Sequence, residues 1–175
     1  MNKKITRFSA SMRILHWAMA ALIISLLSAG MTMVKSLEVW QLELLTLHKA
    51  AGLLVAVLVV VRLVNRWCAT VPALPDSLPR WQKTMALGSH YALYSLMILM
   101  PLTGFLMQYY GARPIAVFSW FTLPSALYPD IELYALYRQL HGFIGYTLAV
   151  LILVHVLAAL QHHFIRKDGV LKSML

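Results

Sequence analysis

Long apolar stretches separated by short polar connections dominate the chain. Four of them, at about 14 to 34, 45 to 65, 87 to 109 and 137 to 162, each approach the ~20 apolar residues that a helix needs to cross a bilayer. The connection between the second and third, CATVPALPDSLPRWQK, is rich in proline and is expected to be irregular. The pattern predicts an all-α fold, an integral membrane four-helix bundle formed by one domain over residues 1-175.

Composition and charge support a membrane protein and predict its orientation. Hydrophobic residues make up 61% and charged residues 12% of the 175 residues, and the net charge is +9. The basic residues that flank the spans on one side are Lys3, Lys4, Arg7, Arg13, Arg62, Arg66, Arg80, Lys83, Arg166, Lys167 and Lys172. Because Lys and Arg resist translocation, this side is expected to face the cytoplasm, with both termini inside. This segregation favours topology over nucleic-acid binding as the reason for the basic charge.

Histidines recur inside the spans, where ionisable residues are costly and tend to mark function. His141 and His155 are fourteen residues apart, nearly four helical turns, so both project from one helix face about 21 Å apart along the axis. With the predicted orientation, His48 and His141 lie near the outer surface. His16, His90 and His155 lie near the inner surface, and His162 and His163 close the last span. The pattern predicts two layers of imidazoles, one in each leaflet.

A pair of neutral imidazoles on facing helices is the axial ligand set of a six-coordinate haem. Zinc would need three or four ligands, and no carboxylate or thiolate lies close to either layer. Small residues one turn after His16, His48, His141 and His155, namely Ala20, Gly52, Gly145 and Ala159, leave room for a flat porphyrin. We therefore expect His16 with His155 to hold the iron of an inner haem b, and His48 with His141 that of an outer one. A helix that starts at Ser9, a plausible N-cap, would carry His16 deep enough to lie level with His155, and His90 remains an alternative to His16.

At these residues the chain resembles the bacterial cytochrome b561 family, and it is similar to the membrane cytochrome b subunits of hydrogenases and formate dehydrogenases. The matching motifs are RILHW at 13 to 17, LHKAAG at 47 to 52, VVRL at 60 to 63, HYALY at 90 to 94, PLTG at 101 to 104, LHGFIGY at 140 to 146 and LVHVLAALQHH at 153 to 163. The resemblance implies a four-helix bundle in the bacterial inner membrane with two b haems, ligated by His16, His48, His141 and His155, and a quinone site near the inner haem. It also implies that some members oxidise superoxide and reduce ubiquinone, while others dock on a soluble redox partner.

The first functional hypothesis is therefore a superoxide:ubiquinone oxidoreductase. Lys49, adjacent to His48, and Arg138, one turn before His141, would supply positive charge that attracts superoxide, or would instead partner haem propionates, Glu43 or Glu132. On the inner side His90, His162 and Arg80 are candidates for donating protons to the quinone. Arg62 and Arg66 are expected to hold the inner propionates.

Two alternatives remain open at this point. A cytochrome b could oxidise quinol and pass electrons to a periplasmic redox protein, and a haem-free metal carrier is a remote third reading. The aromatic connection at 114 to 129 could lie in the membrane interface as a lid over the outer haem or bind a partner.

Overall fold

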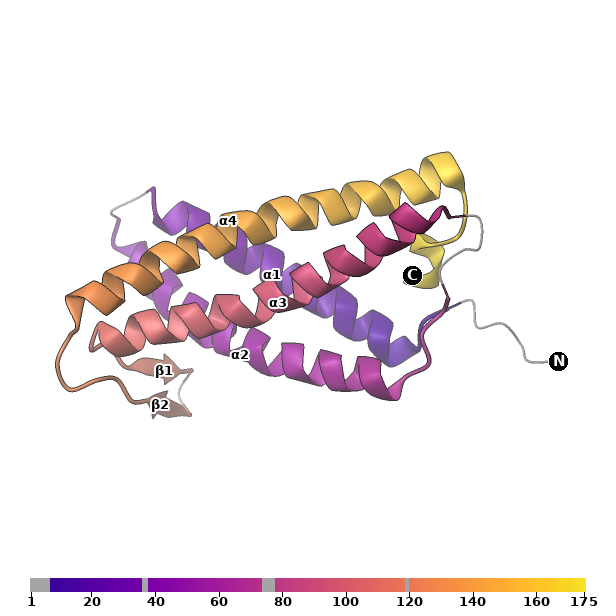
Figure 1. The fold of residues 1–175 in the computed structure, drawn as a ribbon. Helices are drawn as coiled ribbons and strands as arrows, with labels where there is room; N and C mark the ends of the chain where they lie inside the picture. Colours follow the sequence, from indigo (N-terminus) through magenta and orange to yellow (C-terminus); the bar gives the residue numbers. More distant parts are fainter. Residues whose placement is uncertain (1–6, 36–37, 74–77, 119) are drawn as a thin grey trace.

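The computed structural model describes residues 7–35, 38–73, 78–118 and 120–175. Four long helices run side by side in one elongated bundle (Figure 1). They are α1 (Ala10–Met33), α2 (Trp40–Cys68), α3 (Arg80–Tyr110) and α4 (Ile131–Gln161). All four are long and apolar enough to cross a membrane, which confirms the predicted four-helix membrane bundle. The helices begin four to seven residues before the predicted spans and end within three residues of the predicted ends. Helix α4, with 31 residues, is about 46 Å long against a hydrocarbon core of about 30 Å.

Two side-chain caps fix where α1 and α4 begin. The hydroxyl of Ser9 accepts a hydrogen bond from the Met12 N–H, so the predicted helix start at Ser9 is confirmed. The carboxylate of Asp130 accepts from the Leu133 N–H and starts α4 earlier than its apolar stretch suggests. His16 is therefore nearly two turns inside α1, and His141 is three turns inside α4.

The core of the bundle is apolar and narrow. Met19 and Ile23 of α1, Val55 and Val59 of α2 and Leu148 of α4 are buried together. Val57, Val60 and Leu157 are exposed on the outside of the same helices. An exposed apolar surface of this kind suits a protein that is surrounded by lipid.

A small hairpin interrupts the otherwise helical chain in the outer connection. Strand β1 (Ile115–Val117) pairs antiparallel with β2 (Phe121–Leu123), and Ile115 lies opposite Leu123. Ile115 and Val117 are buried and β1 contacts α2, whereas Trp120 is 80% exposed. The sequence did not predict these strands. The hairpin packs against α2 through β1, and its role as a lid over the outer haem stays a prediction.

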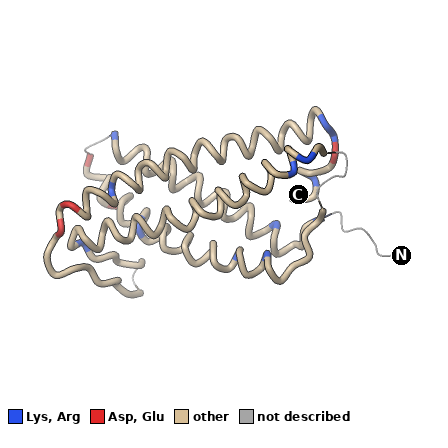
Figure 2. Tube along the Cα trace, in the orientation of Figure 1, with Lys and Arg blue, Asp and Glu red and all other residues tan. Residues whose placement is uncertain are grey.

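The first and last described residues meet at one end of the bundle, because the Phe8 N–H donates to the Ser173 carbonyl. Of the acidic residues that the structure describes, all but Asp168 lie toward the opposite end (Figure 2). The end that carries the termini is therefore the more basic one, as the predicted cytoplasmic side requires. Lys3 and Lys4, which contributed to that prediction, lie outside the described residues.

Candidate functional site: two imidazole layers in the bundle

The outer layer consists of His48 on α2 and His141 on α4. Their ring centroids are 6.4 Å apart. One metal ion bound by a nitrogen of each ring, with bonds of about 2 Å, would set the centroids roughly 6 Å apart. The two rings therefore already have the separation that a shared iron requires.

Hydrogen bonds fix the orientation of the His141 ring. Its Nδ1 lies 3.1 Å from the Met100 carbonyl oxygen, which can only accept a hydrogen bond, and 3.2 Å from the hydroxyl of Thr103. Nδ1 therefore carries the proton, and the lone pair of the neutral ring is on Nε2. Metal-binding histidines commonly donate their other ring N–H to a backbone carbonyl in this way.

Gly104 makes room for that ring on the neighbouring helix. A Cβ atom at this position would lie 3.0 Å from Cε1 of His141, which is tighter than nine in ten real contacts of Cβ atoms. The PLTG motif of α3 thus contains Thr103, which contacts the imidazole, and Gly104, whose missing side chain leaves space for the imidazole ring. The sequence analysis found the motif but not its contact with His141.

An apolar pocket opens beside the outer pair. Its lining residues come from all four helices and are Ile23, Leu26, Leu27, His48, Gly52, Val55, Met97, Met100, Pro101, His141 and Leu148. A Cβ atom at Gly52 would meet no atom within 4 Å, so the space one turn from His48 is open. Nδ1 of His48 is buried and has no hydrogen-bond partner within the described ranges. The open space and the unpartnered nitrogen both suit a bound flat macrocycle.

We expect Gly52→Leu to prevent haem from binding at the outer pair, because the new side chain would enter the pocket between the helices. The measurement is haem per chain by the pyridine haemochrome assay. Gly142→Leu is the matched control, since a Cβ there also meets no atom within 4 Å but Gly142 does not line the pocket. Equal pigment in the two variants would contradict the assignment of this pocket.

The inner layer brings three imidazoles together. The ring centroids of His16 and His155 are 6.4 Å apart, and those of His90 and His155 are 5.9 Å apart. Both separations suit a shared iron, so His155 is common to either pair. The predicted pair, His16 with His155, and the predicted alternative, His90 with His155, therefore lie at the same site.

Arg62 contacts His16 directly. Its guanidinium donates a hydrogen bond of 2.9 Å to Nδ1 of His16, and its Nε donates to the hydroxyl of Tyr94 over 3.2 Å. The guanidiniums of Arg62 and Arg66 both lie 5.9 Å from the centre of the Tyr94 ring. The two predicted propionate-binding arginines thus flank one tyrosine at the inner layer.

Lys49, one of the predicted outer positive charges, lies within electrostatic range of Arg113, which the sequence analysis did not place at the site. Arg113 is held over the ring of Tyr134 at 5.2 Å, and Arg138 is exposed on α4. In the part of the chain that the structure describes, neither Lys49 nor Arg138 forms an ion pair with Glu43 or Glu132.

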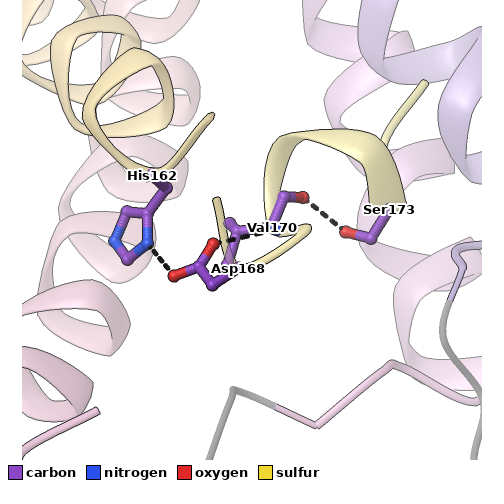
Figure 3. A network of polar contacts seen from close by, with 4 residues as sticks. All are labelled: His162, Asp168, Val170 and Ser173. Carbon is purple, nitrogen blue, oxygen red and sulfur yellow. Dashed lines mark hydrogen bonds and ion pairs between the residues drawn. The ribbon is translucent and has the colours of Figure 1, made fainter. Parts of the chain in front are cut away.

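His162 lies at the inner end, seven residues after His155 on α4. Its Nδ1 is 2.5 Å from a carboxylate oxygen of Asp168 (Figure 3). His163 packs instead against Phe164, at 4.8 Å between ring centroids. The Asp168 contact was not predicted, because it depends on how the chain reverses after α4.

The donor set suits haem better than a metal held by protein ligands alone. No group of three or more His, Cys, Asp or Glu side chains in the described ranges is arranged to hold a metal ion. Paired imidazoles with an open apolar pocket are what a porphyrin needs, since it supplies the four remaining nitrogens. The residues of the outer layer thus fit a haem in both respects, and the inner layer offers the same paired imidazoles.

Comparison with known proteins points the same way. A model of the prokaryotic cytochrome b561 family matches residues 7–175. The chain is 31% identical to cytochrome b561 homolog 2 of Escherichia coli (strain K12), over 91% of this chain and 86% of that one. It is 31% identical to cytochrome b561 homolog 1 of the same organism, over 98% of each. A protein of Yersinia pestis named probable superoxide oxidase CybB is 25% identical over 92% of this chain and 91% of that one.

Proposed function

Because the chain belongs to the prokaryotic cytochrome b561 family, we propose that it oxidises superoxide at the outer end of the bundle and reduces ubiquinone at the inner end. The family consists of membrane electron-transfer proteins that bind b haems, and this chain is a multi-pass protein of the bacterial inner membrane. The observation that carries the proposal is the presence of two imidazole pairs, each with its rings 6.4 Å apart, at opposite ends of one bundle.

Four histidines would hold the two haems. His48 and His141 are the proposed ligands at the outer layer, and His16 and His155 those at the inner layer. His141 and His155 project from one face of α4 about 21 Å apart, so a single rigid helix sets the spacing of both layers. When bound, the haems supply iron centres that accept and release single electrons. The protein orients them through these rings and keeps water away from them with its apolar core.

Arg62 and Arg66 would bind the propionates of the inner haem. A neutral His16 that binds iron through Nε2 carries its proton on Nδ1, which cannot then accept from Arg62. Haem binding therefore requires the guanidinium to leave that nitrogen. A released guanidinium beside Tyr94 is free to pair with a carboxylate, which supports the proposed role of Arg62.

Positive charge at the outer end would attract superoxide, which is an anion. Lys49 follows His48 directly, and Arg113 lies near enough to act with it. Arg138 contributes from the exposed surface of α4. The hairpin covers α2 beside these charges, so the anion would approach through an opening that protein and lipid restrict.

At the inner end, reduction of ubiquinone consumes two protons. His90, His162 and Arg80 are the proposed groups on that side, and His162 has a carboxylate partner. His90 lies against His155 within the layer, whereas His162 lies closer to the aqueous phase. The histidines would donate protons to the quinone oxygens, and Arg80 would bind the quinone through hydrogen bonds.

Rapid mixing of the oxidised protein with superoxide tests the proposal. We expect haem bands to become reduced within the lifetime of superoxide and to be reoxidised by ubiquinone. No haem reduction would overturn the proposed donor. Reduction of the haems by ubiquinol, with reoxidation by a periplasmic protein extract only, would instead support the alternative in which quinol is the donor.

We expect Lys49→Gln to slow haem reduction by superoxide about tenfold at low ionic strength, because a focused positive potential raises the association rate of an anion. Stopped-flow traces at two salt concentrations are the measurement. At high salt, screening should make the rates of haem reduction of the variant and the wild type equal. Lys49→Arg should keep the wild-type rate, and a loss of rate in Lys49→Gln that is independent of salt would contradict electrostatic attraction.

A further inference from the structure

The segment that follows α4 places a carboxylate beside the C-terminal end of that helix. After Gln161 the chain forms a π-helical turn (His162–Arg166), Lys167 then takes a left-handed conformation with φ of 54°, and Gly169 follows with φ of 80°. The chain thereby reverses, and a short 3-10 helix (Leu171–Ser173) returns toward the start of α1. Asp168 lies at the reversal and faces His162 (Figure 3). π-helical turns of this kind are frequent at functional sites.

Both oxygens of the Asp168 carboxylate have partners. One lies 2.5 Å from Nδ1 of His162, and the other accepts the Val170 N–H over 3.2 Å. The side chains of His162 and Asp168 are only 19% and 12% exposed. The other charged side chains that the structure describes on this side are all basic, namely Arg7, Arg13, Arg62, Arg66, Arg80, Lys83, Arg166, Lys167 and Lys172, but the ionic partner of Asp168 in the described part of the chain is His162.

The depth of this pair in the membrane suits a quinone headgroup. The midpoint between the two imidazole layers on α4 is near residue 148, and half a hydrocarbon core of about 15 Å corresponds to about ten residues of helix. His162 therefore lies just outside the hydrocarbon on the inner side, about 10 Å from His155 along the axis. A quinone whose tail stays in lipid places its polar ring at this level.

We propose that Asp168 is a positioning residue for proton delivery, which holds His162 so that Nε2 of its imidazolium donates a proton to an oxygen of the quinone. This rests on the proposed function. Two electrons, one from each of two superoxide ions that become O2, and two protons convert the quinone to quinol. In each proton transfer the Nε2–H bond breaks and an O–H bond forms. His162 keeps its Nδ1 proton toward Asp168, and water on the cytoplasmic side recharges Nε2.

The experiment uses the haem-loaded full chain in nanodiscs, reduced with one equivalent of dithionite per haem, so that superoxide plays no part. Decylubiquinone or ferricyanide is then mixed in, and reoxidation is followed in the α band. Ferricyanide takes an electron without a proton. We expect Asp168→Asn and His162→Gln to slow reoxidation by decylubiquinone at least tenfold and to leave reoxidation by ferricyanide within twofold of the wild type. Asp168→Glu should recover most of the quinone rate.

Ser173→Ala is the control for a merely structural role, since it removes the hydrogen bond of 2.7 Å to the Val170 carbonyl but leaves His162 and Asp168 intact. It should retain the wild-type rate with both acceptors. A quinone rate in Asp168→Asn within twofold of the wild type would overturn the inference. Equal slowing with ferricyanide would also overturn it, because the role would then be structural. If decylubiquinone cannot reoxidise the wild-type protein, the proposed acceptor itself is wrong. This result differs from both of the outcomes that overturn the role of Asp168.

Discussion

Replacing His141 with leucine is expected to leave the purified chain with one haem instead of two. Leucine fills the space of the ring but offers no lone pair to iron, and His48 alone cannot complete a bis-histidine site. The pyridine haemochrome content per chain should halve, and the remaining reduced spectrum should be that of the inner haem. The corresponding His155→Leu variant should lose the inner haem, and the double variant should be colourless.

His163→Leu provides the control for a histidine on the same helix. Its ring packs against Phe164 beyond both layers, so both haems should remain. A double variant that keeps its full pigment would contradict the proposed ligands. The same assay separates His16 from His90: whichever leucine variant loses the inner haem identifies the partner of His155, and we expect it to be His16.

Gly104→Ala is expected to remove most of the outer haem although residue 104 is not a ligand. The added methyl group would lie 3.0 Å from Cε1 and 3.3 Å from Nδ1 of His141. The ring must then shift by a few tenths of an ångström, which strains its hydrogen bond to the Met100 carbonyl and moves Nε2 away from the position that iron requires. Haem content per chain and the temperature at which the outer haem band disappears are the measurements, and both should fall.

Gly88→Ala in the same helix is the matched control. A Cβ atom there meets nothing within 4 Å, so this variant should keep both haems. Its free energy of unfolding should even rise by up to about 1 kcal/mol, because alanine favours a helix more than glycine does. If both glycine variants behave alike, the close approach of His141 to α3 does not matter for haem binding.

The helical period made the two layers predictable. His141 and His155 are fixed relative to each other by one helix, and the alternation of cytoplasmic and outer connections places His48 and His16 at the matching depths. The hydrophobic stretches likewise predicted all four membrane helices. Their ends were less predictable, because polar caps such as Asp130 extend a helix beyond its apolar part.

Contacts between different helices could not be derived from spacing. Small residues four positions after each histidine were expected to make room for haem, and the space at Gly52 is indeed open, but Gly145 lies against Met100. Gly104, which receives the His141 ring, belongs to another helix and has no sequence relation to that histidine. The contacts of Arg62 with His16 and of Lys49 with Arg113 depend on packing in the same way.

The sequence analysis missed the outer hairpin and the chain reversal at Lys167 because neither segment carries the residues that usually mark a turn. The segment around β1 and β2 has no Asn-Gly or Asp-Gly turn that would mark a hairpin. Lys167 adopts a left-handed conformation that usually favours glycine or asparagine, so its sequence gives no sign of a turn. Asp168 therefore looked like an ordinary surface acid.

Both proposed ligand pairs take one member from α4, the last of the four helices to leave the ribosome. Neither pair can close while the earlier helices are being inserted into the bilayer. Cofactor loading must therefore follow translation, and until then α1 and α2 carry imidazoles without their partners. In a cell short of haem, a fully inserted bundle with both imidazole layers unligated would therefore accumulate, rather than a partly synthesised chain.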